Sequence, residues 1–181
     1  PRFSPDGKRI SWISMERDGY EADLKRLFVQ DLKTGQKTFL TDGFEYDVDE
    51  LQWAANSQSL FFLSTKHAEA QLWEIALKGR KIRQITTGMH DYTSLDVQGG
   101  KILAGRQSYI DPTDLYLVDV KTGAAKQLTA ENKSTLDGLA PISVEKRWVK
   151  TTDGGNMLVW VVLPPNFDKT KKYPALLFCQ G

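Results

Sequence analysis

Three related strands, Leu27-Phe28-Val29-Gln30-Asp31, Leu72-Trp73-Glu74-Ile75-Ala76 and Leu115-Tyr116-Leu117-Val118-Asp119, decide the fold. They begin 45 and 43 residues apart, and each leads through a polar turn to a Leu-Thr or Ile-Thr pair at the same two intervals. Those pairs are Leu40-Thr41, Ile85-Thr86 and Leu128-Thr129. A strand, a turn and a second strand that recur together at a fixed spacing indicate a structural repeat built on a hairpin.

A further pair of strands precedes each hairpin. In the first repeat it surrounds Ser4-Pro5-Asp6-Gly7-Lys8, whose Asp-Gly step suits a tight turn. The equivalent pairs run from Trp53 to Phe62 and from Leu95 to Leu103. Four strands every 40 to 50 residues or so are typical of β-propeller blades, which bury both faces against their neighbours. We therefore predict a partial β-propeller of three four-stranded blades, over residues 1–41, 42–86 and 87–129.

The last fifty residues change character. Residues 130–147 carry no strand pattern and are predicted to be a linker. Strands are then predicted on either side of Asp153-Gly154-Gly155, which is a hairpin signature. The run Tyr173 to Cys179 is apolar throughout, as expected of a central strand covered on both faces. Residues 148–181 are therefore predicted to begin a second domain, in a protein that is mostly β.

Charge and composition exclude several classes of function. The chain has 24 Lys and Arg against 23 Asp and Glu, scattered along the sequence, which gives no support to nucleic-acid binding. No apolar run reaches the roughly 18 to 20 residues needed to span a bilayer. The single Cys179 cannot form an internal disulfide, and His67 and His90 have no partners at ligand spacing. We predict no metal site and no cofactor.

Two segments resemble a known family. Phe3 to Ile10 resembles a short propeller motif of TolB-like proteins and of the prolyl oligopeptidase-type serine peptidases. Leu163-Pro164-Pro165-Asn166-Phe167-Asp168, followed by Lys171-Lys172-Tyr173-Pro174 and an apolar run, is similar to the entry into the catalytic domain of the prolyl oligopeptidase family. The dipeptidyl-peptidase and acylaminoacyl-peptidase branches match best, and the resemblance covers the whole chain in the family's order.

This resemblance implies the fold and activity of a longer protein. It implies that residues 148–181 are the first strands of an α/β-hydrolase domain, and that a propeller restricts a Ser-Asp-His triad to short peptides. The chain contains no G-x-S-x-G elbow, and both histidines lie in the propeller repeats. We expect the triad to follow Gly181 and this chain to be inactive by itself. The alternative is a non-catalytic TolB-like interaction module.

Two sets of site residues are predicted. Gln180 and Gly181 enter the loop that commonly lends a backbone N–H to an oxyanion hole, so both are weak candidates for that role. The first repeat has a longer loop between its second and third strands, which carries four acidic residues. They are Glu16, Asp18, Glu21 and Asp23. These carboxylates could attract the α-amino group of a peptide substrate; the alternative is a solvated, charged hairpin.

Partners and location are predicted more coarsely. The resemblance implies a peptide substrate for the longer protein and a periplasmic or secreted location, with a cytoplasmic location as the alternative. We expect no nucleic-acid partner and no membrane-spanning segment. Because three blades cannot close a ring, we also expect self-association through exposed blade edges.

Overall fold

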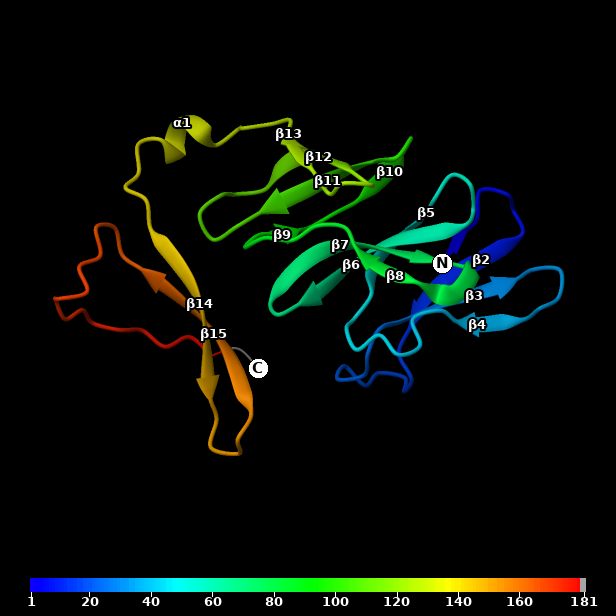
Figure 1. Cartoon of the computed structure of the whole chain (residues 1–181), viewed down its shortest axis with the longest axis horizontal. Coiled ribbons are helices and arrows are strands. Elements are labelled where there is room, and N and C mark those ends of the chain that lie inside the picture. The colour runs from blue at the N-terminus through cyan, green and yellow to red at the C-terminus, as the bar shows by residue number, and fades with distance from the viewer. Residues whose placement is uncertain (180–181) are drawn as a thin grey trace. The chain divides into compact units, whose positions relative to one another are not determined.

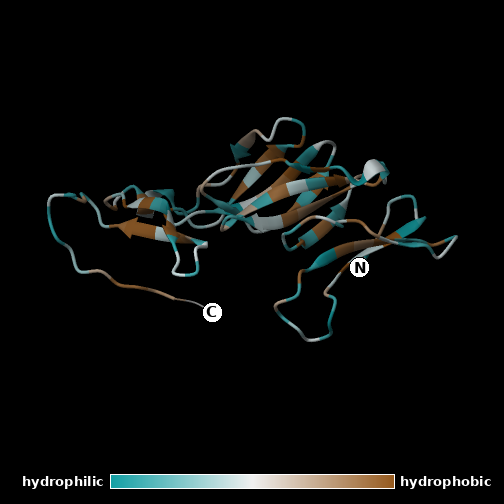
Figure 2. Ribbon diagram, turned by 60° about the horizontal axis from the view of Figure 1, so that its bottom comes forward, coloured by the Kyte–Doolittle hydropathy of each residue, from teal (hydrophilic) through white to brown (hydrophobic). Residues whose placement is uncertain are grey.

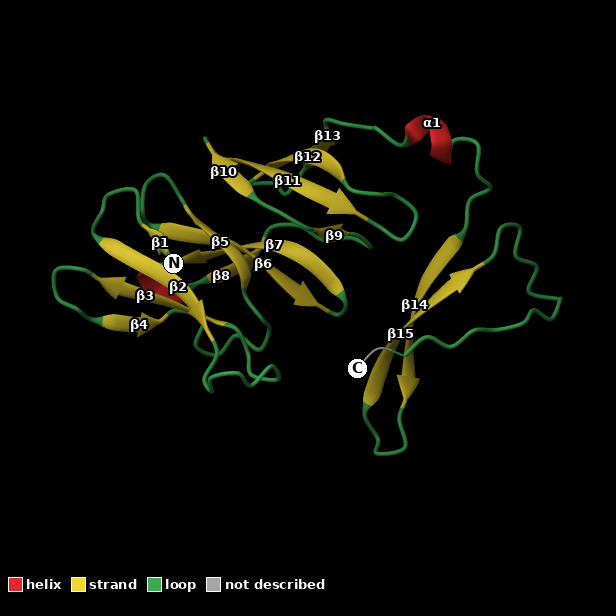
Figure 3. Cartoon of the chain, turned by 180° about the vertical axis from the view of Figure 1, so that it is seen from behind, coloured by secondary structure: helices red, strands yellow, loops and turns green. Residues whose placement is uncertain are grey.

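Antiparallel strand pairing accounts for nearly all regular structure in the chain (Figure 3). The computed structural model describes residues 1–179. The chain divides into two units, Pro1–Lys133 and Ser134–Gly181. Helix is limited to two short segments in the described residues, η1 (Lys78–Arg80) and α1 (Lys133–Leu136). Neither of these is long enough to cross a membrane.

Three sheets make up the first unit, and each follows the order of the chain (Figure 1). The first sheet contains β1 (Arg2–Phe3), β2 (Arg9–Ser14), β3 (Arg26–Asp31) and β4 (Lys37–Phe39). The second contains β5 (Asp49–Trp53), β6 (Ser59–Lys66), β7 (Glu69–Ala76) and β8 (Ile82–Gln84). The third contains β10 (Asp96–Gln98), β11 (Lys101–Gln107), β12 (Asp114–Asp119) and β13 (Ala125–Gln127), with β9 (Asp91–Tyr92) paired to β11. The first two sheets have four strands, and β9 adds a short fifth strand to the four of the third; four-stranded antiparallel sheets in this order are consistent with propeller blades.

The repeated Leu-Thr pair has a structural reason. Each threonine hydroxyl accepts a hydrogen bond from the amide of the first residue in the repeated strand, fourteen residues earlier. The pairs are Leu27 with Thr41 at 3.0 Å, Leu72 with Thr86 at 3.0 Å and Leu115 with Thr129 at 2.9 Å. The outer strand of each sheet ends before it reaches this amide, so no backbone carbonyl of that strand accepts from it. The threonine hydroxyl takes the place of the missing acceptor. The repeat read from the sequence is confirmed at this level of detail.

The second sheet is covered on both faces. Phe62 and Trp73 point into a core shared with Leu27 and Val29 of the first sheet. On the opposite face, Leu72 packs in a second core with residues of the third sheet, including Ile102 and Val118. This arrangement explains the apolar run Leu60-Phe61-Phe62-Leu63 of β6, because alternate side chains enter the two cores. Figure 2 shows such hydrophobic stretches, in brown, within the strands of the sheets.

The second unit contains one hairpin, formed by β14 (Ser143–Lys150) and β15 (Asn156–Leu163). Strand β14 begins at Ser143, inside the segment for which the sequence predicted a linker. Charged residues such as Lys146 interrupt the apolar pattern of β14, so the sequence does not predict a strand there. The apolar side chains of this hairpin come mainly from its partner strand, β15. The Lys146 ammonium lies 5.0 Å from the ring centre of Trp160, its partner in the register.

The strand predicted over residues 173–179 does not form. These residues have no strand conformation, and Leu176, Leu177 and Phe178 are 102%, 87% and 86% exposed. A strand needs a partner for its backbone groups, and none of the described residues pairs with this run. Among residues 1–179, no parallel sheet covered by helices is present, so the expected α/β-hydrolase portion is not evident here.

Candidate functional site

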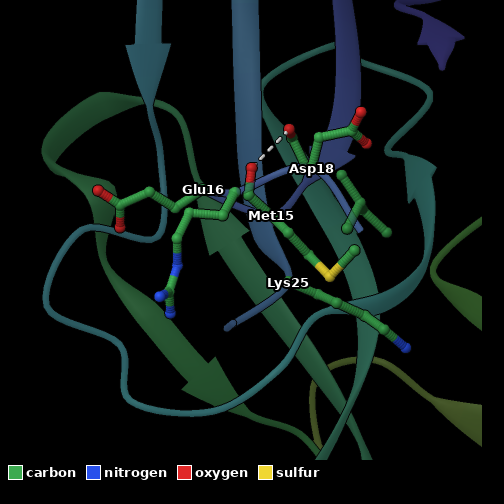
Figure 4. Close-up of a pocket in the computed structure, with 7 residues that line it drawn as sticks. Met15, Glu16, Asp18 and Lys25 are labelled. Carbon is green, nitrogen blue, oxygen red and sulfur yellow. Dashed lines mark hydrogen bonds between the residues drawn. The ribbon is translucent and has the colours of Figure 1, made fainter. Parts of the chain in front are cut away.

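The candidate site is the long loop between β2 and β3, which surrounds a cavity of about 520 Å³ (Figure 4). The cavity is lined by the end of β2 and by loop residues that include Met15, Glu16, Asp18 and Lys25. The four predicted carboxylates all lie in this loop, and the fold separates them into two groups.

Two of the four carboxylates are engaged in ion pairs. Asp23 accepts hydrogen bonds from the backbone amide of Arg17 at 2.7 Å and from its Nε at 3.1 Å. The guanidinium holds the pKa of the Asp23 carboxyl below its ordinary value and lies 3.6 Å from the centre of the Tyr20 ring. Glu16 pairs with Arg26 of β3 at 3.3 Å. The first pair joins two parts of the loop, and the second joins the loop to β3.

The other two carboxylates, Asp18 and Glu21, are exposed. Within residues 1–179, no ion pair joins either of them to a basic side chain. A carboxylate that is already ion-paired attracts a ligand cation less than a free one. Of the predicted set, Asp18 and Glu21 are therefore the ones available to an incoming ammonium group.

Lys25 anchors the loop to the segment that enters the second sheet. Its backbone amide donates to Asp47 at 2.7 Å, and its ammonium lies 2.7 Å from Asp49. Its carbonyl oxygen also accepts a hydrogen bond from Val48 at 2.9 Å. Asp49 raises the pKa of Lys25 through this contact. Sequence reasoning missed Arg17 and Lys25, because the partners of each lie beyond its immediate neighbours and no local pattern marks the pairs.

A second cavity of about 390 Å³ lies along the first strands of the three sheets. Its lining includes Arg2 from β1, Glu50 and Gln52 from β5, and Asp96 from β10. The Gln52 side chain links the second and third sheets, since it donates to Asp96 at 3.0 Å and accepts from the Val97 amide at 2.8 Å. Glu50 has a positive φ of 45° at a register shift in β5. Charged side chains of both signs therefore face this cavity.

The remaining sequence predictions have no assembled site around them. Gln180 and Gly181 lie outside the described residues. His67 occupies an exposed turn, whereas His90 is half-buried, and burial lowers its pKa. Across residues 1–179, no three His, Cys, Asp or Glu side chains converge in a way that could hold a metal ion.

Residues 1–107 match the family model described as the dipeptidyl peptidase IV (DPP IV) N-terminal region. The match covers more than half of the chain. The chain belongs to this family. In keeping with that, the chain is 63% identical, over all 181 residues, to dipeptidyl-peptidase 5 of Porphyromonas gingivalis. It is also 25% identical to dipeptidyl-peptidase 5 of Schizosaccharomyces pombe. It covers 26% of each relative and so spans about a quarter of their length.

Solved structures support the fold of the chain. An acylaminoacyl peptidase in complex with a chloromethyl ketone superposes with a TM-score of 0.76, over 93% of this chain and 25% of that one, at 20% identity. TolB from Acinetobacter baumannii superposes with a TM-score of 0.58, over 70% of this chain and 31% of that one, at 19% identity. At these identities the likeness is one of fold alone.

Proposed function

We propose that the chain is part of a serine exopeptidase that removes dipeptides from short peptides, and that its sheets control how substrate reaches the catalytic centre. One observation carries this proposal: the 63% identity to dipeptidyl-peptidase 5 of Porphyromonas gingivalis extends over every part of the chain. The proposal assigns the catalytic triad to the longer protein. This chain has no G-x-S-x-G elbow for a nucleophile, so by itself it is inactive.

The proposed division of the chain follows its two units. Residues 1–129 form three propeller blades (1–41, 42–86 and 87–129), residues 130–147 connect them to the next domain, and residues 148–181 begin an α/β-hydrolase domain. The exposed side chains of Leu176, Leu177 and Phe178 support this assignment, because an apolar run of this kind requires cover on both faces. The rest of a parallel sheet, with its helices, would supply that cover.

The chain's proposed contribution to the reaction is to receive the substrate. An exopeptidase that releases dipeptides must detect a free α-ammonium group two residues from the bond that it cleaves. Asp18 and Glu21 supply exposed negative charge for that purpose, while the pairs of Asp23 with Arg17 and of Glu16 with Arg26 hold the loop in shape. Gln180 and Gly181 remain candidates for the oxyanion loop, where a backbone N–H would stabilise developing negative charge.

A TolB-like interaction module is the second candidate. It is favoured by the structural likeness to TolB, but that likeness covers 70% of the chain and the likeness to the acylaminoacyl peptidase covers 93%. Both likenesses concern the fold alone, so it is the 63% identity to dipeptidyl-peptidase 5 that favours the peptidase. With the peptidase we also propose a periplasmic or secreted location, with a cytoplasmic location as the alternative.

The test compares the 181-residue chain with the longer protein that contains it. Both are incubated with a fluorophosphonate probe, which labels activated serine nucleophiles. We expect one label per molecule of the longer protein and none on the 181-residue chain. Fluorogenic dipeptide substrates with a free or an acetylated amine then test the exopeptidase assignment, since only the free amine should be processed. Labelling of the short chain, or equal turnover of both substrates, would contradict the proposal.

A further inference from the structure

The connecting segment, residues 86–92, leads from β8 through β9 and is bonded to both the second and the third sheet. The Gln71 side chain of β7 donates from Nε2 to the carbonyl oxygens of Gly88 at 3.1 Å and His90 at 2.7 Å. Asp91 accepts a hydrogen bond from a backbone amide of β7 at 2.8 Å. The last residue of the segment pairs with β11 and lies in the core that the two sheets share. The segment therefore joins the second sheet to the third.

The His90 ring is seated within this connecting segment. A Cβ added at Gly88 would lie 2.4 Å from Cε1 of His90, so the ring rests directly on the Gly88 backbone. The φ of Gly88 is 141°, a conformation that residues with a side chain rarely adopt. The ring also meets Tyr92 edge to face, with ring centres 5.3 Å apart. Glycine at this position therefore makes room for the ring, which a larger residue would displace.

This seat suits an uncharged imidazole. The Nε2 atom of His90 is buried, and no hydrogen-bond partner for it is present among residues 1–179. A protonated imidazole carries an N–H on both nitrogens, so in this seat the Nε2 proton would be buried without an acceptor. Tyr92, which the ring faces, supplies no negative charge, because burial raises the pKa of its phenol.

Charged groups from three strands act on the ring. Arg106 of β11 opposes a positive charge on it, whereas Glu69 of β7 and Asp91 of β9 favour one. Burial is the largest effect, and together with Arg106 it holds the pKa of His90 below its ordinary value of 6.5. The guanidinium of Arg106 lies 3.5 Å from the ring centre of Tyr116. The two carboxylates therefore do not compensate for the burial of the ring and for this neighbouring cation.

We propose that His90 is a pH-sensitive switch, which keeps the connecting segment in place while its imidazole is neutral and releases the segment when the imidazole gains a proton. A ring that is protonated in water does not return to its seat, because that would bury an unpaired charge. The carbonyl oxygens of Gly88 and His90 move with the ring, so the hydrogen bonds from Gln71 are lost with it. Because the folded pKa is the lower one, the closed segment is fully stabilised above about pH 6.5 and loses stability as the pH falls below that value.

Hydrogen exchange followed by mass spectrometry on the longer protein tests this switch, since it reports the opening of one segment within a large chain. The exchange of peptides covering the connecting segment is compared with that of the same peptides when unstructured, at pH 7 and at pH 5. We expect their protection to fall by up to about thirtyfold over this range, because an imidazole with the ordinary pKa of 6.5 is almost fully protonated at pH 5. Peptides from β2 and β3 should keep their protection.

His90→Phe is the decisive variant, because phenylalanine keeps a ring beside Gly88 and cannot be protonated. His90→Gln cannot be protonated either, and it tests the same point without an aromatic ring. Both variants should show equal protection of the connecting segment at the two pH values. His67→Gln is the matched control, since it replaces the other histidine of the 181 residues, in an exposed turn, and should retain the loss in acid.

Three results would overturn the proposal. The first is a connecting segment that is equally protected at pH 7 and pH 5 in the unsubstituted protein. The second is a loss in acid that persists in both His90 variants. The third is an equal loss in β2 and β3, which would show that acid loosens the sheets generally and not at this segment.

Discussion

The side chain of Thr86 accepts a hydrogen bond from the backbone amide of Leu72 at 3.0 Å, and both residues are almost completely buried. The same contact joins Thr129 to Leu115, but there Leu115 is 42% exposed. Thr86→Val keeps the shape of the side chain and leaves the Leu72 amide unpaired in the core. We expect this change to reduce the free energy of unfolding by about 1–3 kcal/mol.

Thr129→Val is the control for that change, because water can reach the amide of Leu115. It should cost clearly less, and urea unfolding followed by circular dichroism measures both variants. Equal losses would show that burial of the amide does not determine the strength of this contact.

Gly35 and Gly123 occupy equivalent turns with the same φ of 73°, but their surroundings differ. A Cβ added at Gly35 would meet no atom within 4 Å, whereas one at Gly123 would lie 2.2 Å from the carbonyl oxygen of Ile85. Gly35→Ala should therefore cost only the strain of a left-handed residue, about 1–2 kcal/mol. Gly123→Ala must also displace the backbone, and we expect a substantially larger fall in thermal stability. Calorimetry of the two variants measures the difference, and equal melting temperatures would contradict it.

Asp119 links stability to pH. Lys101 and the Thr122 amide and hydroxyl hold the pKa of this carboxyl well below its ordinary value of 3.8. Because the folded pKa is the lower one, the stabilisation is complete above about pH 4 and is lost as the pH falls further. Asp119→Asn should lower the melting temperature at pH 7 and flatten its decline between about pH 4 and 2. Asp18→Asn, in the exposed loop, is the control. An unchanged acid profile in Asp119→Asn would show that other groups dominate.

Gln52 joins the second and third sheets through contacts to Asp96 and Val97. Gln52→Glu keeps the acceptor for the Val97 amide but replaces the donor to Asp96 with a second carboxylate. Like charges at this distance repel, so we expect a melting temperature several degrees lower at pH 7. The loss should shrink at high salt concentration, which screens the repulsion between the two carboxylates. A deficit that does not depend on salt would contradict the electrostatic explanation.

In the longer protein, Asp18→Asn and Glu21→Gln test the proposed recognition of the substrate amine. Each should lower kcat/KM for a dipeptide substrate by about fivefold, which corresponds to about 1 kcal/mol for an exposed charge contact. Glu131→Gln removes an exposed carboxylate outside the loop and should have no effect. If the loop variants match this control, the four carboxylates are only a solvated part of the loop.

Side-chain contacts between residues that are not neighbours in the sequence could not be predicted from it. The repeats were readable because apolar strands, the polar turns that follow them and the recurring Leu-Thr or Ile-Thr pair are local signals. The pairing of Glu16 with Arg26, and of Lys25 with Asp47 and Asp49, was not readable. The first contact depends on how the long loop folds back on β3, and the others depend on how this loop meets the segment that enters β5; no short pattern encodes either.

By itself, the sequence determined that this protein consists mainly of repeated four-stranded antiparallel sheets, because turn chemistry and apolar spacing act within each repeat. Only the tertiary structure decided which acidic residues are free. It engages Asp23 and Glu16 and leaves Asp18 and Glu21 exposed. It also decided that residues 173–179, although apolar, form no strand, because a strand exists only where another strand satisfies its backbone hydrogen bonds.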